Sequence, residues 1–304
     1  MLLNTAQVKR FDSAPNYKVY RGAGASARES QDVDQVTIGT YNVKNLFDGI
    51  DQDPSRGTTE KPDRELRALA AVIANSKADV VALQEVENID VLNKFLQDFM
   101  PEQFQHAVLV EGNDGRGIDV AVISKFDITN VVSHKENRFP KPDGSGQTDF
   151  SRDLLRVDLQ VGQYPLSVYT THLKSKRGGE ESTVQRQAEA NEVRRILEQE
   201  MGNFEGKNFV VTGDLNDSPM ANTTKTIREG EPGHPRLIDG LDGKPWNQRD
   251  TWPSDRPRRQ IDFIMFPEHM ADNLVKQEVQ HHSQASTASD HMMVAATFNL
   301  RDEA

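Results

Sequence analysis

Short apolar runs separated by polar turns make up most of the chain. Many of these runs are rich in β-branched residues and bounded by turn residues, a pattern typical of strands. They cover residues 36–43, 79–86, 117–124, 127–133, 154–161, 166–172, 208–214, 260–266 and 292–299. Residues 162–165 join two of the runs by a short turn, which indicates antiparallel pairing. One more short strand is expected at residues 17–20.

Helical patterns are fewer than strand patterns. Pro62 stands where a first helical residue is tolerated, and apolar residues then recur at helical spacing. Ser182 and Gln185 have the spacing of a capping box, which predicts that a second helix begins at Ser182. A third helix is expected from about Ile89 and ends before Pro101.

This balance of elements favours an α+β fold in which two mainly antiparallel sheets pack face to face with helices outside. Such packing buries strands on both faces. Residues 1–35 are predicted to form a polar N-terminal arm, and residues 36–304 a single domain without an internal linker. Four stretches between the elements look like loops, and long loops inside a compact domain are usually functional. They are residues 49–61, 134–150, 174–181 and 241–259.

Composition narrows the possible chemistry. The 304 residues include 36% hydrophobic residues, enough for a sizeable core, and no cysteine. The lack of thiols excludes disulfides, cysteine-ligated zinc, iron–sulfur clusters and a thiol nucleophile. The net charge of −11 excludes a broadly basic surface, so a phosphate-bearing substrate would need a local basic patch or a bound metal. No apolar run is long enough to span a membrane and no signal peptide is visible; a cytoplasmic location is favoured, although the compartment stays open.

Polar side chains repeatedly mark the carboxyl ends of the apolar strands. They are Asn42, Glu85, His172, Asp214 with Asn216, and Asp262, and the segment Ser289-Asp290-His291 opens the last strand. A single polar residue at a strand end usually just begins a loop. Six such sites rich in carboxylates, amides and imidazoles, in a chain without thiols, indicate an oxygen site for a hard cation with histidines beside it.

The order of these residues resembles the endonuclease/exonuclease/phosphatase superfamily, which includes deoxyribonuclease I, exonuclease III, abasic-site endonucleases, neutral sphingomyelinases and inositol-polyphosphate 5-phosphatases. The matching segments are Tyr-Asn-Val-Lys-Asn (41–45), Leu-Gln-Glu-Val (83–86), Thr-His-Leu-Lys-Ser (171–175), Gly-Asp-Leu-Asn (213–216), Ile-Asp-Phe-Ile (261–264) and Ser-Asp-His (289–291). Each motif is weak alone, but Gly-Asp-x-Asn and Ser-Asp-His in this order are specific. The resemblance covers most of residues 36–304 and implies that they form a catalytic domain of this type.

The resemblance implies a four-layer αββα sandwich with the site at one edge. By correspondence of motifs, Glu85 would be the main ligand of Mg²⁺ or Mn²⁺, Asn42 would support it, and Asp290 would lie next to the metal. Asp214 and Asn216 would hold the attacking water and the scissile phosphate, and would also be metal-binding residues. Carboxylate and amide oxygens are the ligands that Mg²⁺ prefers, and they leave it waters that can be deprotonated.

The resemblance also implies roles for the histidines. His291 would contact the phosphate, with Asp262 orienting its imidazole and raising its basicity. His172 would either stabilise the pentacovalent transition state or assist protonation of the leaving group.

The sequence departs from the family pattern in two places. Lys44 stands where the abasic-site branch usually has an acidic metal ligand, which favours another branch or a lysine that reaches a phosphate. No tyrosine matches the phosphate-binding tyrosine of several nucleases, and Arg152 is the better candidate because a guanidinium suits bidentate binding.

Several further residues have a functional and a structural interpretation. Lys174, Lys176 and Arg177 would either grip phosphates or form a solvated turn, and at least one of Arg256, Arg258 and Arg259 is expected in the cleft; Lys174 and Arg258 are the preferred phosphate ligands. Trp246 and Trp252 would stack on a base or anchor their loop. Asp119 would support the metal site or simply begin a strand, whereas His106, His281 and His282 are expected to be surface or packing residues.

The predicted function is that of a divalent-metal-dependent phosphoesterase, first of all a nuclease acting on DNA or RNA. The alternative is a phosphatase or phosphodiesterase acting on a small or lipid-linked phosphate, such as an inositol phosphate or a sphingomyelin-like head group. The charge of −11 favours that alternative, and the basic loops favour the nuclease. A catalytically inactive binding module is disfavoured because every expected catalytic position is filled. The partner expected is nucleic acid; no protein partner is evident, and a monomer is expected.

Overall fold

The computed structural model describes residues 18–21, 33–50 and 59–300. The predicted strand at residues 17–20 is found as β1 (Lys18–Arg21), which pairs antiparallel with β4 (His106–Leu109); Tyr17 lies outside the described residues. The division into residues 1–35 and 36–304 stays a prediction.

Two sheets form the centre of the molecule. The first has the strand order β1-β4-β5-β3-β2-β15-β14 and the second β12-β13-β11-β10-β9-β6. The other strands of the first sheet are β2 (Gln35–Leu46), β3 (Val80–Val86), β5 (Asp119–Ser124), β14 (Leu274–Val279) and β15 (Val294–Asn299). Those of the second are β6 (Asp127–Ser133), β9 (Leu155–Val161), β10 (Tyr164–His172), β11 (Phe209–Asp214), β12 (Leu237–Asp239) and β13 (Asp262–Pro267). Pairing is antiparallel except for one parallel pair in each sheet, β2 with β3 and β10 with β11.

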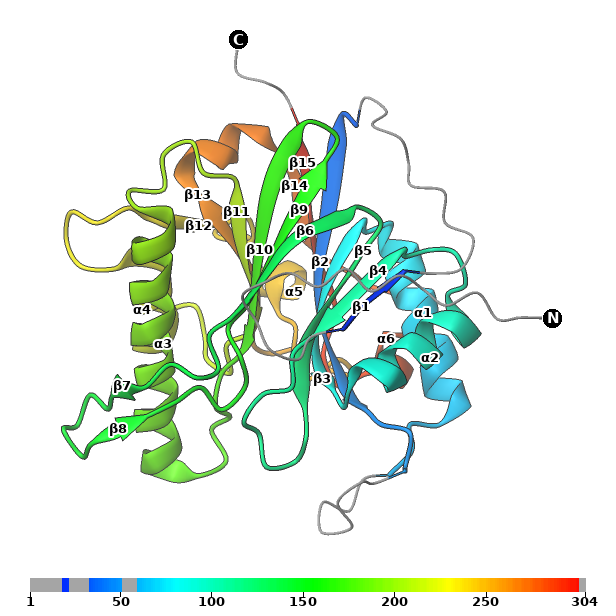
Figure 1. The fold of residues 1–304 in the computed structure, drawn as a ribbon, viewed down its shortest axis with the longest axis horizontal. Helices are drawn as coiled ribbons and strands as arrows, with labels where there is room; N and C mark the ends of the chain where they lie inside the picture. The colour runs from blue at the N-terminus through cyan, green and yellow to red at the C-terminus, as the bar shows by residue number, and fades with distance from the viewer. Residues whose placement is uncertain (1–17, 22–32, 51–58, 301–304) are drawn as a thin grey trace.

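Helices cover the outer faces of both sheets, which gives the four-layer αββα sandwich and confirms the expected α+β fold (Figure 1). α1 (Asp63–Ser76) and α2 (Ile89–Phe99) lie on the first sheet, and α3 (Gly179–Met201) lies on the second. Smaller helices complete the fold: α4 (Asn222–Glu229), α5 (Trp246–Arg249), η1 (Glu268–Asn273) and α6 (Ala285–Ala288). No helix in the described part of the chain is long and apolar enough to cross a membrane.

Three apolar layers hold the sandwich together. The middle layer joins the facing sides of the sheets, for example Val122 of β5 and Val157 of β9. A second layer packs α1 and α2 on the first sheet, and a third packs α3 on the second. Central strands are therefore buried on both faces, which is why they read as nearly continuous apolar runs.

The structure corrects some predicted boundaries. α3 begins at Gly179 instead of Ser182, and the predicted capping box does not form because Gln185 Nε2 donates to Asp149 O and to Glu189 Oε1. β14 was missed because it is an edge strand with polar and exposed positions. The predicted loop 134–150 contains a small hairpin of β7 (Phe139–Pro140) and β8 (Gln147–Thr148).

Candidate active site

The predicted site residues converge at one edge of the sandwich, where the carboxyl ends of the two parallel strand pairs meet. In the second sheet His172 lies opposite Asp214, and Asp214 lies opposite Asp262. Asn42 of the first sheet reaches across, and its Nδ2 donates to Asp214 Oδ2 at 3.1 Å. The two sheets thus build a single site, as ligand sites in sheets with parallel strands commonly lie beyond the carboxyl ends of strands.

Backbone irregularities aim the side chains of the first sheet at this edge. β2 is irregular between Asn42 and Leu46, and β3 between Gln84 and Val86. Lys44 (φ 51°), Asn45 (φ 53°) and Glu85 (φ 66°) all adopt left-handed conformations there. Such conformations cost about 1–3 kcal/mol each in a residue other than glycine, and they cluster at functional sites. The fold therefore stabilises strained backbone in order to present Glu85.

Glu85 is held by its neighbours from β2. Asn42 Nδ2 donates to Oε1 at 3.3 Å, and the Asn45 amide donates to Oε2 at 3.1 Å. Asn45 Oδ1 is buried and has no hydrogen-bond partner among the described residues. An orphaned amide oxygen beside a carboxylate is the arrangement that a hard cation satisfies, so these residues fit a divalent metal.

Gly213 permits the close approach of β11 to β10. Its φ is 137°, and a Cβ at this position would lie 1.9 Å from Thr171 O. No other residue type fits without moving the backbone that carries His172 and Asp214. The need to avoid this steric clash therefore explains the glycine of the Gly-Asp-Leu-Asn motif.

Asp262 and His291 form a buried pair. His291 Nδ1 lies 3.0 Å from Asp262 Oδ2, and Thr251 Oγ1 donates to the same oxygen at 2.6 Å. Burial lowers the pKa of His291, but the carboxylates of Asp262 and Asp214 outweigh it and raise this pKa to about 10. The two carboxylates therefore favour the imidazolium form of His291, whose Nε2 lies 3.8 Å from Asp214 Oδ2.

Asp214 is at the centre of the cluster. It accepts hydrogen bonds from the Asn216 amide at 2.8 Å and from Asn42, and its Oδ2 lies 3.4 Å from His172 Nε2. Burial raises the pKa of Asp214, and the Asp262 charge adds to this effect. Burial and the nearby Arg152 lower the pKa of His172 well below its usual value, so this imidazole is uncharged.

The Ser-Asp-His segment is tied to β2. Ser289 Oγ donates to Asn42 O at 2.7 Å and accepts from the His291 amide at 3.1 Å. This turn leaves Asp290 in the wall of the cavity beside His291. The predicted metal residues and the predicted catalytic residues are thus adjacent, although their roles stay predictions.

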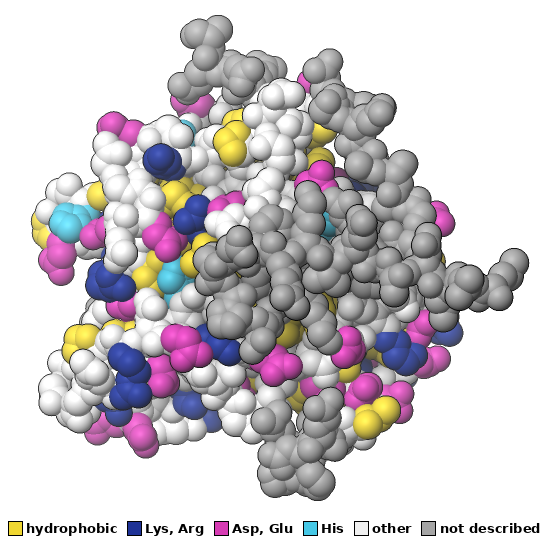
Figure 2. Space-filling model, in the orientation of Figure 1, with side chains coloured by type: hydrophobic (Ala, Val, Ile, Leu, Met, Phe, Trp, Pro, Cys, Tyr) yellow, Lys and Arg dark blue, Asp and Glu magenta, His cyan; other side chains and the backbone are white. Residues whose placement is uncertain are grey.

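A cavity of about 910 Å³ opens above these residues. Its wall includes seven basic residues against four carboxylates: Lys44, Arg116, Arg152, Lys174, Lys176, Arg177 and Arg259, with Glu85, Asp114, Asp214 and Asp290. On the face of the molecule in Figure 2, by contrast, acidic and basic side chains are interspersed. A locally positive cavity in a chain of net charge −11 concentrates anionic ligands there.

Two predicted phosphate ligands line this cavity and one does not. Arg152 is buried and its Nε pairs with Asp114 Oδ2 at 3.0 Å, while Lys174 is half-buried. Arg258, and with it Arg256, lies outside the cavity wall; both line a smaller neighbouring cavity. At least one of Arg256, Arg258 and Arg259 is expected in the cleft, and Arg259 lines it. The phosphate-binding role of Arg258 stays a prediction.

The structure distinguishes between a functional and a structural position for the tryptophans, Asp119 and the outer histidines. Trp252 lines the main cavity, and Trp246 lies on an outer one. Asp119 is buried outside the cavity wall and accepts from the Gly112 amide at 2.6 Å, a structural role. His106 is buried near Asp127, and His281 is exposed, as expected.

Sequence reasoning missed several residues that hold the site. Thr251 orients Asp262, and Asn45 holds Glu85. Glu189 of α3 is buried and accepts from the amides of Ser151 at 2.9 Å and Lys174 at 2.7 Å. Asn45 lies within a recognised motif and could have been found there, whereas Thr251 and Glu189 carry no signal in the sequence.

Two sets of side chains could hold a metal. Ligand atoms of Asp214, Asp262 and His291 lie within 4.8 Å of one another. However, Asp262 already has Thr251 and His291 as hydrogen-bond partners, and His291 uses Nδ1 for this contact, which disfavours both as ligands. Glu85 and Asp290 line the cavity beside the unpartnered Asn45 Oδ1, and they fit the role better.

Comparison with known proteins agrees with this geometry. The Endonuclease/Exonuclease/phosphatase family matches residues 39–291. No protein of curated function matches the chain. Among solved structures, the human Nocturnin catalytic domain with bound sulfate shows 16% identity and a TM-score of 0.63, covering 88% of this chain and 94% of that one. Truncated TDP2 from Caenorhabditis elegans shows 18% identity and a TM-score of 0.56, covering 87% and 98%.

A third similar structure is a mannosyl-6-phosphatase from Bacteroides thetaiotaomicron, with 14% identity, a TM-score of 0.58, and coverage of 86% of this chain and 98% of that one. Identities this low show a common fold. The family match, however, spans most of the chain and includes every strand end that builds the site. The chain therefore belongs to the Endonuclease/Exonuclease/phosphatase family.

Proposed function

We propose that this chain is a divalent-metal-dependent phosphodiesterase that hydrolyses DNA or RNA. The observation that carries the proposal is the basic wall around a carboxylate and histidine centre in an otherwise acidic protein. A polymer presents several phosphates at once. The phosphates that flank the scissile bond would be bound by the wall residues for which the described part of the chain provides no ion pair: Lys44, Lys174, Arg177 and Arg259.

Glu85, Asp290, Asn42 and Asn45 would hold Mg²⁺ or Mn²⁺. The ion, when bound, would supply Lewis-acid activation of the phosphoryl oxygens. Asn42 Nδ2 donates to both Glu85 and Asp214, and would hold the two carboxylates at a fixed distance from one another.

The attacking water would be held by Asp214 and Asn216. The raised pKa of Asp214 suits it to accept a proton from that water as the P–O bond forms. The His291 imidazolium would bind a nonbridging phosphate oxygen through Nε2, because Asp262 holds Nδ1. The uncharged His172 would donate a hydrogen bond to the phosphorane-like transition state, which favours the first of its two predicted roles.

A second candidate is a phosphatase or phosphodiesterase acting on a small phosphate, such as a sugar or lipid head-group phosphate. It is supported by the net charge of −11 and by the likeness to a mannosyl-6-phosphatase. A small substrate would use the central residues and leave the outer basic residues idle.

The test is a panel of substrates assayed with Mg²⁺ and with Mn²⁺. The panel contains plasmid DNA, single-stranded DNA, RNA, bis-p-nitrophenyl phosphate, p-nitrophenyl phosphate and mannose 6-phosphate. The proposal predicts cleavage of at least one nucleic acid, weaker hydrolysis of bis-p-nitrophenyl phosphate and loss of both in EDTA. Turnover of monoesters without cleavage of any nucleic acid would reject it in favour of the second candidate.

A further inference from the structure

Two smaller cavities lie along the loop that joins α5 to β13, next to the main cavity. A second cavity of about 410 Å³ shares Trp252 and Arg259 with the main one. A third cavity of about 590 Å³ shares Asp255 with the second. Residues 246–259 therefore contribute to the walls of three cavities that are neighbours through shared residues, and we call the two smaller cavities the distal track.

The first part of the distal track is basic. Arg256, Arg258 and Arg259 are exposed, and none of them forms an ion pair with any residue that the structure describes. Asp255 is the only carboxylate in the wall of the second cavity. Arginines without acidic partners are available to the phosphates of an anionic chain.

The far end of the distal track is aromatic. Trp246 is 66% exposed, and few large apolar side chains of the described residues are so open to solvent. It lies in the wall of the third cavity with His281, His282 and Met292. A tryptophan that anchored its loop would be buried, so this exposure argues against a packing role.

The loop is held in a defined position relative to the reaction centre. The Ser254 amide donates to Asp290 O at 2.7 Å, and Ser254 Oγ donates to Ser289 O at 2.6 Å. Within the loop, the amides of Thr251 and Trp252 both donate to Arg259 O. A ligand bound on the loop would therefore lie at a fixed position relative to Ser289 and Asp290, which precede His291.

We propose that the distal track binds a single strand of nucleic acid beyond the scissile phosphate, with the arginines on its phosphates and a base stacked on Trp246. The alternation of free guanidiniums and an open aromatic surface is the combination that binds single strands without sequence preference. A double helix would not place unstacked bases against the indole. This inference rests on the proposed nuclease function and adds its strand preference.

The experiment compares Trp246→Ala with a control, Val275→Ala, which removes another exposed apolar side chain on β14 outside the track. Each enzyme is assayed with single-stranded DNA and RNA of about 12 nucleotides, within the usual range of single-strand site sizes, and with bis-p-nitrophenyl phosphate. Loss of one base contact should lower the ratio of kcat/KM for the oligonucleotide to that for the small ester by about fivefold or more. The control should keep the wild-type ratio.

Binding is measured separately from turnover. Because Trp246 and Trp252 are the only tryptophans, a fluorescence titration in EDTA with excitation that avoids tyrosine absorption reports on them alone. We expect the oligonucleotide to quench the fluorescence of the wild type, and an oligonucleotide of the same length with abasic sites in place of its bases to do so much less. Trp246→Ala should remove most of this difference between the two ligands.

The arginines provide a second, independent variant. Arg256→Gln with Arg258→Gln should flatten the dependence of oligonucleotide affinity on salt, because each lost phosphate contact removes about 0.7 from the slope of log K against log salt. An unchanged ratio for Trp246→Ala, or an unchanged salt slope, in an enzyme that does cleave nucleic acid would overturn the distal track alone. Failure of the wild type to cleave any nucleic acid would overturn the proposed function instead.

Discussion

Single residues of this protein carry roles that depend on unusual local conformation. Glu85 has a left-handed backbone conformation, and its carboxylate is held by Asn42 and Asn45. The strain of this backbone conformation is explained if the side chain binds a ligand. His291 owes its charge to the carboxylates on either side of it. Glu85 and Asp262, the partner of His291, lend themselves to substitutions that remove charge with little change of volume.

Glu85→Gln should weaken metal dependence far more than folding, because the amide keeps the size of the side chain but loses the charge that attracts the cation. The measurement is the hydrolysis rate as a function of Mg²⁺ concentration, together with the Tm in EDTA. A wild-type rate at sub-millimolar Mg²⁺ would show that Glu85 is not a metal ligand.

His291→Ala and Asp262→Asn should each lower kcat by about 10²-fold or more, the usual scale for a positioned electrostatic group. Since Asp262 acts through the imidazole, the double variant should lose little more than the worse single variant. The kcat values of all four enzymes test this. Losses that multiply would mean that the two residues act separately.

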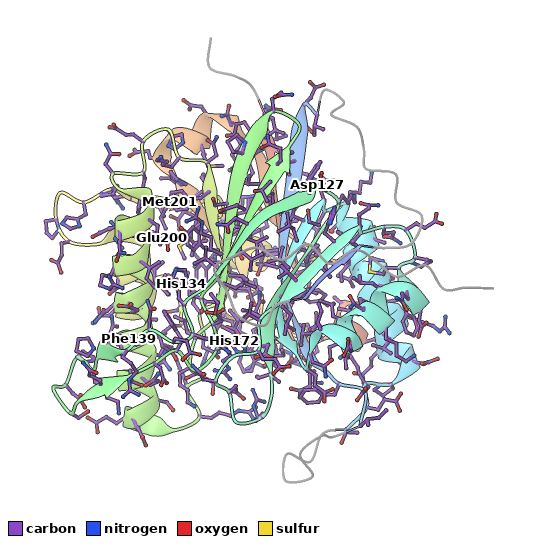
Figure 3. All side chains as sticks on the ribbon, in the orientation of Figure 1. Asp127, His134, Phe139, His172, Glu200 and Met201 are labelled. Atoms are coloured by element: carbon purple, nitrogen blue, oxygen red, sulfur yellow. The ribbon has the colours of Figure 1, made fainter. Side chains whose placement is uncertain are left out.

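Helix α3 is the element that supports the substrate side of the site from behind. Its buried Glu189 binds the backbone next to Arg152 and the backbone of Lys174. At its far end Glu200 binds His134, and Figure 3 shows these two side chains beside α3, away from His172. We therefore expect substitutions at Glu189 to affect substrate binding, and substitutions of the pair that Glu200 forms with His134 to affect stability.

Glu189→Gln should raise KM for a phosphodiester several-fold while kcat falls less, because an amide can accept only one of the two backbone bonds and the loop of Lys174 is released. Glu181→Ala, an exposed carboxylate on the same helix, is the control. The kinetic constants and the Tm are measured for both variants. A fall in Tm with unchanged KM would assign Glu189 a structural role only.

The His134–Glu200 pair should make stability depend on pH. Burial lowers the pKa of His134, but the bond to Glu200 and the Leu154 carbonyl outweigh it and raise this pKa above its usual 6.5. Burial also raises the pKa of Glu200, but bonds from His134 and Tyr169 outweigh it and lower that pKa from 4.5 to about 2. A raised histidine pKa stabilises the fold below pH 6.5 and ceases to do so as the pH rises through the folded value; the lowered glutamate pKa stabilises above pH 4.5 and is lost toward pH 2.

The Tm difference between the wild type and His134→Gln should therefore be largest between pH 4.5 and 6.5 and should shrink at higher pH. Thermal unfolding of both proteins across this range is the measurement. The exposed His281, changed to Gln, serves as the control and should show no such profile. A difference that grows with rising pH would contradict the assigned direction.

At the scale of the whole molecule, the site draws carboxylates from both sheets. Glu85 and Asn42 come from the first sheet, and Asp214 and Asp262 from the second. A cation held by Glu85, Asn42 and Asp290 would favour the folded protein over the unfolded chain, in which these residues are not brought together.

Mg²⁺ should therefore raise the Tm in a concentration-dependent way. At a Mg²⁺ concentration of a hundred times Kd, binding should add about 2.7 kcal/mol to the free energy of unfolding. Glu85→Gln should shift this dependence to higher Mg²⁺ concentrations. Calorimetry with and without Mg²⁺ tests this, with K⁺ at equal ionic strength as the control. An equal effect of both salts would remove the evidence for a specific site.

The sequence predicted the layers and most strand positions because apolar periodicity reflects burial directly. It also located Asn42, Glu85, His172, Asp214, Asp262 and His291 through strand-end motifs, since strand ends at one edge are adjacent in any such sandwich. It failed at β14, whose edge position makes it polar, and at the start of α3, where Gln185 has other partners. Local rules cannot anticipate partners that come from distant segments.

By itself, the sequence determined the fold class, the chemical nature of the centre and the exclusion of thiol chemistry, because these depend on residue types and on local periodicity. Only the tertiary structure decided which basic residues face the centre. Arg152 and Arg259 line the main cavity, whereas Arg256 and Arg258 line a smaller neighbouring cavity. It likewise decided that Thr251 and Glu189 hold the site, since a hydrogen bond across many residues exists only once the chain has folded.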